Sequence, residues 1–247
     1  MKRLAGKRCL VTGGSRNLGR GLCLAFAREG ARVAFTYHRN ERAAAETREL
    51  ILALGGSAPL VFQGTVTDAT HAEATVAAVV DAFGGLDVLV NNAGTTQVLP
   101  FALVEEADWD HVMAVNVRGA YSFCRAALRP MIRQRGGRVL NVGSFGHDRT
   151  IPLPVHYAAS KSALVGLTDA LAREVGRYQI LVNLLQPGLM EAGLGRSVPA
   201  ARREEYLAHN PSGRLGTLEE VAATAVWLVS DENTFMTGAH VPVDGGL

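Results

Sequence analysis

The chain has 247 residues, a length that suits one α/β domain. Hydrophobic residues make up 48% of the chain and charged residues 19%, which gives enough apolar material for a large core and too little charge for a disordered protein. The formal net charge is +2 and the basic residues are spread along the chain, which argues against a nucleic-acid-binding protein.

The three cysteines, Cys9, Cys23 and Cys124, are scattered, and none belongs to a CxxC pair or stands at zinc-binding spacing from histidines. We therefore expect no metal site, and reduced thiols buried as small hydrophobic side chains in a cytoplasmic protein. The basic N-terminal residues lead directly into a strand pattern without the apolar stretch of a signal peptide. No apolar run is long enough to span a membrane.

Short apolar runs alternate with longer amphipathic stretches along the whole chain. The predicted strands are residues 8–12, 32–37, 59–63, 86–91, 138–142, 180–185 and 240–243. The predicted helices are residues 18–29, 41–54, 70–83, 108–134, 155–178 and 218–230. Strands separated by helices of this length form βαβ units with right-handed crossovers. The sequence therefore predicts a single α/β domain over residues 1–247, with a doubly wound parallel sheet in a three-layer α/β/α sandwich.

Two features interrupt this rhythm. Pro130 stands late in the fourth predicted helix, where we expect a kink or an early end of the helix. Residues 189–213 combine glycines, prolines and charges without a strand pattern. Because ligands bind beyond the carboxyl ends of strands in open α/β sheets, this segment is interpreted as a substrate lid. The alternative is a disordered surface loop.

A glycine-rich turn, Thr12-Gly13-Gly14-Ser15-Arg16-Asn17-Leu18-Gly19, follows the first predicted strand. Glycines here permit a tight turn and let the backbone approach a pyrophosphate, while the next helix directs its free N–H groups at the anion. Such turns join many strands to helices, so the signal gains weight from its place in the first βα connection.

The turn resembles the TGxxxGxG motif of the short-chain dehydrogenases/reductases, with Asn17 in place of the middle glycine. Asparagine tolerates left-handed backbone conformations, so the turn is expected to survive, with a side chain that crowds or shifts the pyrophosphate. Asn91-Asn92-Ala93-Gly94 and Pro187-Gly188 match two further motifs of this family. The resemblance implies a Rossmann-type fold, with the first motif near the adenine ribose and the second near the nicotinamide carboxamide.

The resemblance also implies a set of cofactor-binding residues. Thr65, beside Val66, stands where the family commonly has an aspartate that contacts the adenine amine, and its hydroxyl would bind more weakly. The full expected set is Gly13, Ser15, Arg16, Asn17, Leu18, Gly19, His38, Arg39, Thr65, Val66, Asn92, Ala93, Gly94, Tyr157, Lys161, Pro187 and Gly188.

Charge at the second strand indicates which nicotinamide cofactor fits. A site for NAD usually ends this strand with Asp or Glu, but here Tyr37 is followed by His38 and Arg39. Arg16 in the glycine-rich turn would lie near the same ribose. Two arginines without a carboxylate suit a 2′-phosphate, so we expect NADP(H). The alternative is that both arginines are solvated surface residues.

The candidate catalytic residues are Ser144, Tyr157, Lys161 and Asn116. Tyr157 and Lys161 lie four residues apart, on one face of a predicted helix, where an ammonium lowers the pKa of a neighbouring phenol. That pair alone occurs on many helices by chance. Ser144, thirteen residues before Tyr157, and Asn116 on the preceding helix complete the catalytic set of the family in the same order.

The resemblance implies a role for each of these residues. Ser144 would orient the substrate carbonyl, and Tyr157 would donate a proton while NADPH delivers hydride. Lys161 would lower the pKa of Tyr157 and bind the nicotinamide ribose. Asn116 would hold a water that links Lys161 to bulk solvent.

Within the family, the chain most resembles bacterial 3-oxoacyl-acyl-carrier-protein reductases. Arg129 and Arg173 match basic positions that such reductases use to dock the acidic carrier protein, although both are equally explained as solvated surface residues. The polar residues His147 and Asp148 also allow a ketoreductase of specialised metabolism. The alternatives are an alcohol or sugar dehydrogenase working in oxidation, and a non-catalytic NADP(H)-binding scaffold or sensor.

Members of this family usually form homotetramers, and we expect the same here. The helices predicted at 108–134 and 155–178 would pack against their symmetry mates through Ala-rich faces, and the C-terminal end at 243–247 would form the second interface. These faces carry Ala114, Ala120, Ala126, Ala127, Ala158, Ala159, Ala163 and Ala170.

Overall fold

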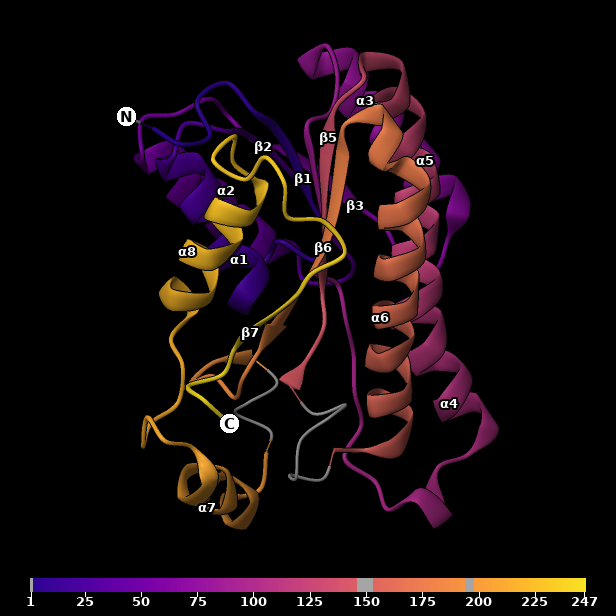
Figure 1. The fold of residues 1–247 in the computed structure, drawn as a ribbon, viewed down its shortest axis with the longest axis vertical. Coiled ribbons are helices and arrows are strands. Elements are labelled where there is room, and N and C mark those ends of the chain that lie inside the picture. Colours follow the sequence, from indigo (N-terminus) through magenta and orange to yellow (C-terminus); the bar gives the residue numbers. More distant parts are fainter. Residues whose placement is uncertain (1, 146–152, 194–197) are drawn as a thin grey trace.

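A seven-stranded parallel sheet forms the centre of the computed structural model, which describes residues 2–145, 153–193 and 198–247 (Figure 1). The order across the sheet is β3-β2-β1-β4-β5-β6-β7, and every neighbouring pair runs parallel. The strands are β1 (Arg8–Val11), β2 (Arg32–Tyr37), β3 (Leu60–Gln63), β4 (Val88–Asn91), β5 (Gly137–Val142), β6 (Ile180–Pro187) and β7 (His240–Val243). The predicted doubly wound sheet is confirmed.

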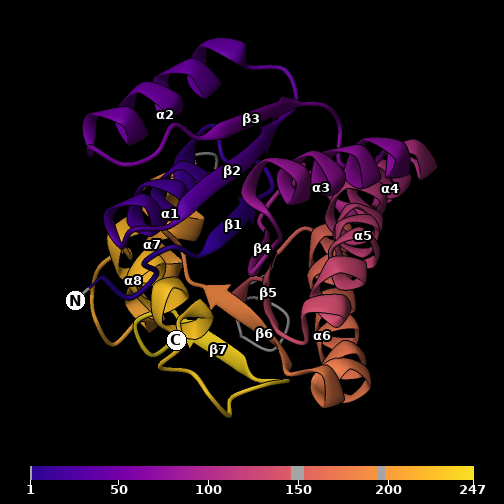
Figure 2. The ribbon, with the colours of Figure 1, turned by 90° about the horizontal axis from the view of Figure 1, so that it is seen from above.

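Two helical layers cover the sheet (Figure 2). One face carries α1 (Asn17–Arg28), α2 (Glu41–Ala53) and α8 (Leu218–Val229), and the other carries α3 (Ala69–Phe83), α5 (Gly119–Gln134) and α6 (Val155–Val175). The strands carry apolar side chains on both faces, so each helical layer buries a separate apolar cluster against the sheet. Within the described residues, no helix combines the length and the apolar character needed to cross a membrane.

The order of the strands reverses between β1 and β4. From β1 the chain moves outward to β2 and β3, then returns to place β4 on the other side of β1. Loops leaving neighbouring strands on either side of this point diverge, which opens a crevice at the carboxyl edge of the sheet. The first glycine-rich turn and the Asn92 motif both begin at this crevice.

The helix predicted at 108–134 is composite. It consists of α4 (Glu106–Met113), a π-helical stretch at Ala114–Arg118 and α5, which run on without a break. The helix does not end at Pro130, so the expected early end is wrong. Pro130 has no N–H to donate to the Ala126 carbonyl, so the helix lacks that hydrogen bond, yet four more residues follow Pro130 in α5.

The segment predicted to be irregular contains α7 (Ala200–His209), a helix that the sequence pattern did not reveal. Its polar composition hid it, because Tyr206 is its only buried residue. Before α7, Met190 forms an isolated parallel bridge with Gly216. Residues 194–197 lie outside the described residues.

Three alanines of α5 do not point outward as expected, whereas Ala170 of α6 is exposed. Ala120 is 7% exposed, Ala126 6% and Ala127 0%, and all three belong to apolar clusters inside the protein. Alanines on these helices let α5 approach the sheet closely, since the small side chains leave little distance between backbones. The predicted packing of these helices against other copies stays a prediction.

Candidate active site

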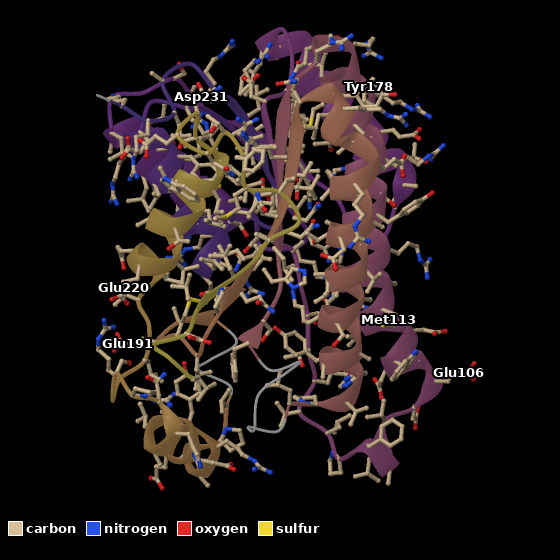
Figure 3. The ribbon with its side chains drawn as sticks, in the orientation of Figure 1. Glu106, Met113, Tyr178, Glu191, Glu220 and Asp231 are labelled. Atoms are coloured by element: carbon tan, nitrogen blue, oxygen red, sulfur yellow. The ribbon has the colours of Figure 1, made fainter. Side chains whose placement is uncertain are left out.

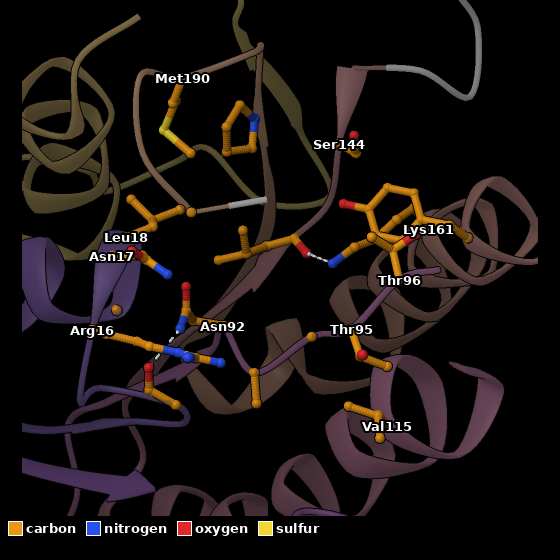
Figure 4. Close-up of a pocket in the computed structure, with 18 of the residues that line it drawn as sticks. Arg16, Asn17, Leu18, Asn92, Thr95, Thr96, Val115, Ser144, Lys161 and Met190 are labelled. Atoms are coloured by element: carbon orange, nitrogen blue, oxygen red, sulfur yellow. Dashed lines mark hydrogen bonds between the residues drawn. The ribbon is translucent and has the colours of Figure 1, made fainter. Parts of the chain in front are cut away.

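A cavity of about 1300 Å³ lies at the carboxyl edge of the sheet, above the crevice between β1 and β4. It is larger than the space a single small ligand fills, so it has room for a dinucleotide together with a substrate. Every residue predicted to bind the cofactor lines it, and so does Ser144. Asn116 lies behind the lining. Figure 4 shows Ser144 and Lys161 on one side of the cavity, and Arg16 and Asn17 across from them.

Close backbone packing shapes the glycine-rich turn. A Cβ atom on Gly19 would overlap the carbonyl oxygen of Gly13, so only glycine fits there. Asn92 Nδ2 donates to the Thr12 carbonyl at 2.9 Å and to the Gly13 carbonyl at 3.2 Å. The Thr12 hydroxyl accepts from the backbone N–H groups of Asn92 and Ala93, both at 3.0 Å. The Asn92 motif therefore holds the turn in a shape that a phosphate can approach.

Asn17 adopts φ = 49°, the left-handed conformation that the sequence predicted for this position. Its side chain lies against the start of the lid segment, because a Cβ atom on Gly193 would stand 3.3 Å from the Asn17 Cβ. The asparagine thus replaces the family's glycine without changing the fold of the turn.

Three cationic or ionisable side chains meet at the end of β2. Arg16, His38 and Arg39 are exposed and line the same part of the cavity as Tyr37. Neither arginine has a carboxylate partner within the described residues, whereas Arg8 pairs with Asp87 at 2.6 Å. Among the described lining residues there is no Asp or Glu at all. The site is therefore built for an anionic ligand.

The hydroxyl of Thr65 is already engaged. Its Oγ1 lies 2.8 Å from Oγ1 of Thr67 and accepts from the Thr67 backbone N–H at 3.3 Å. The residue lines the cavity as predicted, but its partner in the free protein is the neighbouring threonine.

Lys161 is only 5% exposed and donates from Nζ to the Val142 carbonyl at 2.7 Å, as the dashed line in Figure 4 marks. The Nζ atom lies 5.7 Å from the centre of the Tyr157 ring. Burial lowers the pKa of Lys161 to about 8. The two residues share one face of α6, as their spacing predicted.

The expected lowering of the Tyr157 pKa is wrong for this arrangement. Desolvation raises the pKa of Tyr157 above its usual value, and a hydrogen bond with Ser144 opposes that rise. Lys161 is drawn to the Val142 carbonyl and lies over the aromatic ring, so its charge is not directed at the phenolic oxygen. Tyr157 therefore holds its proton at neutral pH.

Asn116 lies in the π-helical stretch and is 2% exposed. Its Oδ1 accepts from the Thr95 backbone N–H at 2.8 Å, and its Nδ2 donates to the Thr95 carbonyl at 3.0 Å and to Ser160 Oγ at 2.9 Å. The side chain thus ties the loop after β4 to α6, beside Lys161. The water that the sequence analysis assigned to Asn116 stays a prediction.

Arg129 and Arg173 lie away from the cavity. Arg173 is close to the end of α6, near Tyr178, which Figure 3 places at the opposite end of the molecule from the lid. Twelve residues of helix separate Arg173 from Lys161, a distance of roughly 18 Å along the axis. Both arginines are exposed, but within one subunit neither reaches the site.

Sequence reasoning missed the outer wall of the cavity. Arg202 and Tyr206 of α7 line it, and their four-residue spacing was the only signal of a shared helical face. His147 and Asp148 lie outside the described residues. Other lining residues that the motifs did not reveal are Thr36, Asn40, Gly64, Thr95, Thr96, Val98, Leu99, Pro100, His111, Val115, Leu153, Pro154, Ala192, Val198 and Pro199.

Comparison with known proteins identifies the family. Residues 13–247 match a family model described as enoyl-(acyl carrier protein) reductase. A 3-oxoacyl-acyl-carrier-protein reductase of Thermotoga maritima is 37% identical over 99% of this chain and 99% of its own length. The chain belongs to the short-chain dehydrogenase/reductase family.

Solved structures of other short-chain dehydrogenases/reductases agree with the fold. One from Burkholderia cenocepacia, in complex with NADP, is 34% identical, with a TM-score of 0.92 over 99% of this chain and 98% of its own. An NAD⁺-bound xylitol dehydrogenase is 30% identical, with a TM-score of 0.91 over 99% of this chain and 100% of its own. This protein is therefore an oxidoreductase that acts on CH–OH or C=O groups with a nicotinamide cofactor.

Proposed function

We propose that this short-chain dehydrogenase/reductase is an NADPH-dependent ketoreductase whose substrate is a 3-oxoacyl thioester or a related ketone. The observation that carries the proposal is that Ser144, Tyr157 and Lys161 line one cavity together with the glycine-rich turn. A phenol that keeps its proton at neutral pH is suited to donate it to a developing alkoxide. The same set argues against a non-catalytic scaffold.

The residues of the cavity fit NADP(H). The turn admits a pyrophosphate because a Cβ on Gly19 would fill the space its backbone needs, and the N-terminus of α1 follows directly. Arg16 and Arg39, without carboxylate partners in the described part of the chain, suit a 2′-phosphate. Solved structures with this fold include one in complex with NADP and one bound to NAD⁺, so the fold does not decide between the two cofactors. In this chain the preference for NADP(H) rests on Arg16 and Arg39.

The cofactor supplies hydride chemistry, and the protein supplies position and proton transfer. Ser144 donates a hydrogen bond to the substrate carbonyl and orients it. Tyr157 gives its phenolic proton to the carbonyl oxygen as negative charge develops there. Lys161 donates to the Val142 carbonyl in the free protein and would give up that hydrogen bond to bind the cofactor ribose and to stabilise the phenolate that remains. Asn116 fixes α6 and the loop after β4 around these groups.

The proton on Tyr157 is used differently in the two directions of the reaction. Reduction starts from the phenol and oxidation from the phenolate, so a raised pKa of Tyr157 moves the pH optimum of oxidation upward. An alcohol or sugar dehydrogenase working in oxidation is therefore the second candidate, to be separated by its cofactor preference and direction.

Apolar side chains dominate the part of the cavity beyond Ser144 and Tyr157. This composition suits an acyl chain or another apolar ketone substituent. The apolar residues are Val98, Leu99, Pro100, Val115, Phe145, Leu153, Pro154, Leu189, Met190, Val198 and Pro199. Similarity to 3-oxoacyl-acyl-carrier-protein reductases supports a carrier-bound substrate, and a carrier protein docked on Arg129 and Arg173 would serve a cavity in another subunit.

Assembly as a homotetramer in the cytoplasm completes the proposal. The face available for this is a groove lined by Met113, Val117, Arg118, Tyr121 and Leu167. It lies on the outer surface of α4, α5 and α6, and Tyr121 is 52% exposed there.

The test is NADPH consumption, followed by absorbance, with acetoacetyl thioesters, simple ketones and quinones as substrates and NADH as the control cofactor. We expect turnover of the thioester with NADPH, and in Tyr157→Phe we expect at least a hundredfold loss of turnover with NADPH binding retained. Substantial activity of Tyr157→Phe would overturn the assignment of the proton donor. Binding of NADPH without turnover of any ketone would favour the scaffold or sensor.

A further inference from the structure

Tyr206 is the one buried side chain of α7, the helix that covers the cavity. It is 1% exposed and lines the cavity, whereas every other residue of α7 is partly or fully exposed. A tyrosine buried so completely needs hydrogen-bond partners for its hydroxyl, because an unpaired buried hydroxyl is costly.

The Tyr206 hydroxyl joins two segments that are distant in sequence. It accepts from the Leu189 backbone N–H at 3.1 Å and donates to the Asp244 backbone carbonyl at 3.0 Å. Asn210, just after α7, donates to the same carbonyl at 2.7 Å. Burial raises the pKa of Tyr206, so the hydroxyl keeps the proton that it donates. The helix α7 is thereby tied to the ends of both β6 and β7.

The contact with Leu189 acts on the cofactor side of the cavity. The Leu189 carbonyl accepts from the Gly216 N–H at 3.0 Å, so both polar backbone groups of Leu189 are held. A Cβ atom on Gly188 would stand 2.5 Å from the Tyr206 hydroxyl, which leaves no room for any other residue. Gly188, Leu189 and Met190 all line the cavity, and their backbone path is set by these contacts.

The ring of Tyr206 acts on the catalytic side. It meets the Phe145 ring edge to face, with centroids 5.4 Å apart and an interplanar angle of 72°. Phe145 directly follows Ser144, and both aromatic residues belong to one apolar cluster with Leu189 and Leu215. One side chain of the lid therefore contacts the neighbour of the catalytic serine and the turn beside the cofactor.

We propose that Tyr206 is a positioning residue. Its hydroxyl holds the backbone of the Pro187–Met190 turn in place, and its ring holds Phe145, the residue that follows Ser144, in place. The role in catalysis rests on the proposed function, but the placement of the turn does not. In the sequence, residues 187–190, 206 and 244 show no periodic relation, so only the fold brings them together.

The first variant is Tyr206→Phe, which keeps the ring and removes the hydroxyl. We expect the Kd for NADPH to rise about tenfold, because the Pro187–Met190 turn is then less ordered before the cofactor binds, while kcat changes by less than about twofold. Hydrogen exchange in the free protein should increase in the peptide that covers residues 186–192. Tyr178→Phe, in a partly buried tyrosine at the far end of α6, is the matched control and should change neither quantity.

The second variant is Tyr206→Leu, which also removes the ring. We expect the same weaker NADPH binding together with a fall of at least fivefold in kcat, because Phe145 loses its partner beside Ser144. If Tyr206→Phe weakens only NADPH binding and Tyr206→Leu also lowers kcat, Tyr206 has a positioning role. A loss of stability alone would not separate the two effects in this way.

The proposal is overturned if Tyr206→Phe binds NADPH as tightly as the wild type and exchange at 186–192 is unchanged. It is equally overturned if exchange rises evenly across the whole chain and the melting temperature falls with Kd unaffected, since that would be a purely structural role. Neither measurement needs the substrate. A wild type that turns over no ketone would defeat the proposed function and leave the exchange test of Tyr206 readable.

Discussion

Asn17 holds a backbone conformation that favours glycine. Its φ of 49° lies in the left-handed region, where most side chains cost 1–2 kcal/mol and asparagine costs less. The position is exposed at the rim of the cavity, so neighbouring side chains do little to offset the cost. Stability at this turn is thus decided by the backbone preference of one residue.

Replacing Asn17 by alanine should lower the free energy of unfolding by about 1 kcal/mol, because alanine has no local hydrogen bond to favour the left-handed conformation. Asn17→Gly should be as stable as the wild type or slightly more stable. Urea unfolding of the three proteins measures the difference. Equal stability of the alanine and glycine variants would show that the turn does not keep this conformation in solution.

Lys161 is the residue whose charge depends most on where the fold places it. Burial lowers its pKa to about 8, so the ammonium is charged at pH 7 and neutral above pH 9. The charge is needed to bind the cofactor ribose in the proposed mechanism. The affinity for NADPH therefore falls as the pH rises, because binding that needs the protonated lysine is present below pH 8 and is lost as the pH rises through that value.

The affinity for NADPH should therefore fall about tenfold between pH 7 and pH 10, measured by fluorescence titration. In Lys161→Arg the guanidinium stays charged over this range, so the affinity should not vary with pH, even if it is lower at pH 7. A wild-type affinity that stays constant up to pH 10 would contradict the lowered pKa of Lys161.

Among the secondary-structure elements, the junction of β2 and α2 decides the choice of cofactor. The strand ends at Tyr37, which is 9% exposed, and the chain then presents His38 and Arg39 to the cavity before Asn40 caps α2. Asn40 Oδ1 accepts from the Ala43 N–H at 2.9 Å, which satisfies one free donor at the helix start. The cations thus lie on a short, anchored connection.

Exchanging Tyr37 for aspartate places a carboxylate where a ribose 2′-OH would be bound and a 2′-phosphate repelled. We expect the ratio of kcat/KM for NADPH to that for NADH to fall at least tenfold in Tyr37→Asp. The change at a neighbouring surface position, Arg42→Ala, serves as the control because Arg42 pairs with Glu46 outside the cavity. An unchanged ratio in Tyr37→Asp would mean that the 2′-phosphate lies elsewhere.

At the scale of the whole molecule, the proposed homotetramer needs a surface through which the subunits bind one another. The outer face of α4, α5 and α6 carries the groove of Met113, Val117, Tyr121 and Leu167, which is apolar and partly exposed. A contiguous apolar surface of this kind is typical of an interface. The same helices direct Asn116, Tyr157 and Lys161 inward, so an interface there would also stabilise the site.

Analytical ultracentrifugation should give the mass of four copies of the 26.2 kDa chain. Leu167→Glu places a charge in the groove and should yield smaller species, because burying an unpaired carboxylate at an interface is costly. Leu50→Glu, at an exposed leucine of α2 away from the groove, should leave the mass unchanged. A wild type that sediments as a monomer would refute the tetramer.

The sequence by itself determined the order of strands and helices, the glycine-rich turn and the set of Ser144, Tyr157 and Lys161. The strands and helices follow from local periodicity, whereas the glycine-rich turn and the set of Ser144, Tyr157 and Lys161 were recognised through the resemblance to the short-chain dehydrogenases/reductases. Asn17 was also understood in advance, since backbone preference belongs to the residue.

Only the tertiary structure decided what depends on burial and on contacts between distant segments. It raised the pKa of Tyr157 where the Tyr–Lys spacing predicted a lowered one, because desolvation outweighs the hydrogen bond with Ser144 and Lys161 donates to the Val142 carbonyl instead. It also buried the alanines of α5 inside the protein. It also formed α7 and joined Tyr206 to Leu189 and Asp244, since a helix with one buried residue gives no periodic signal until the rest of the fold covers it.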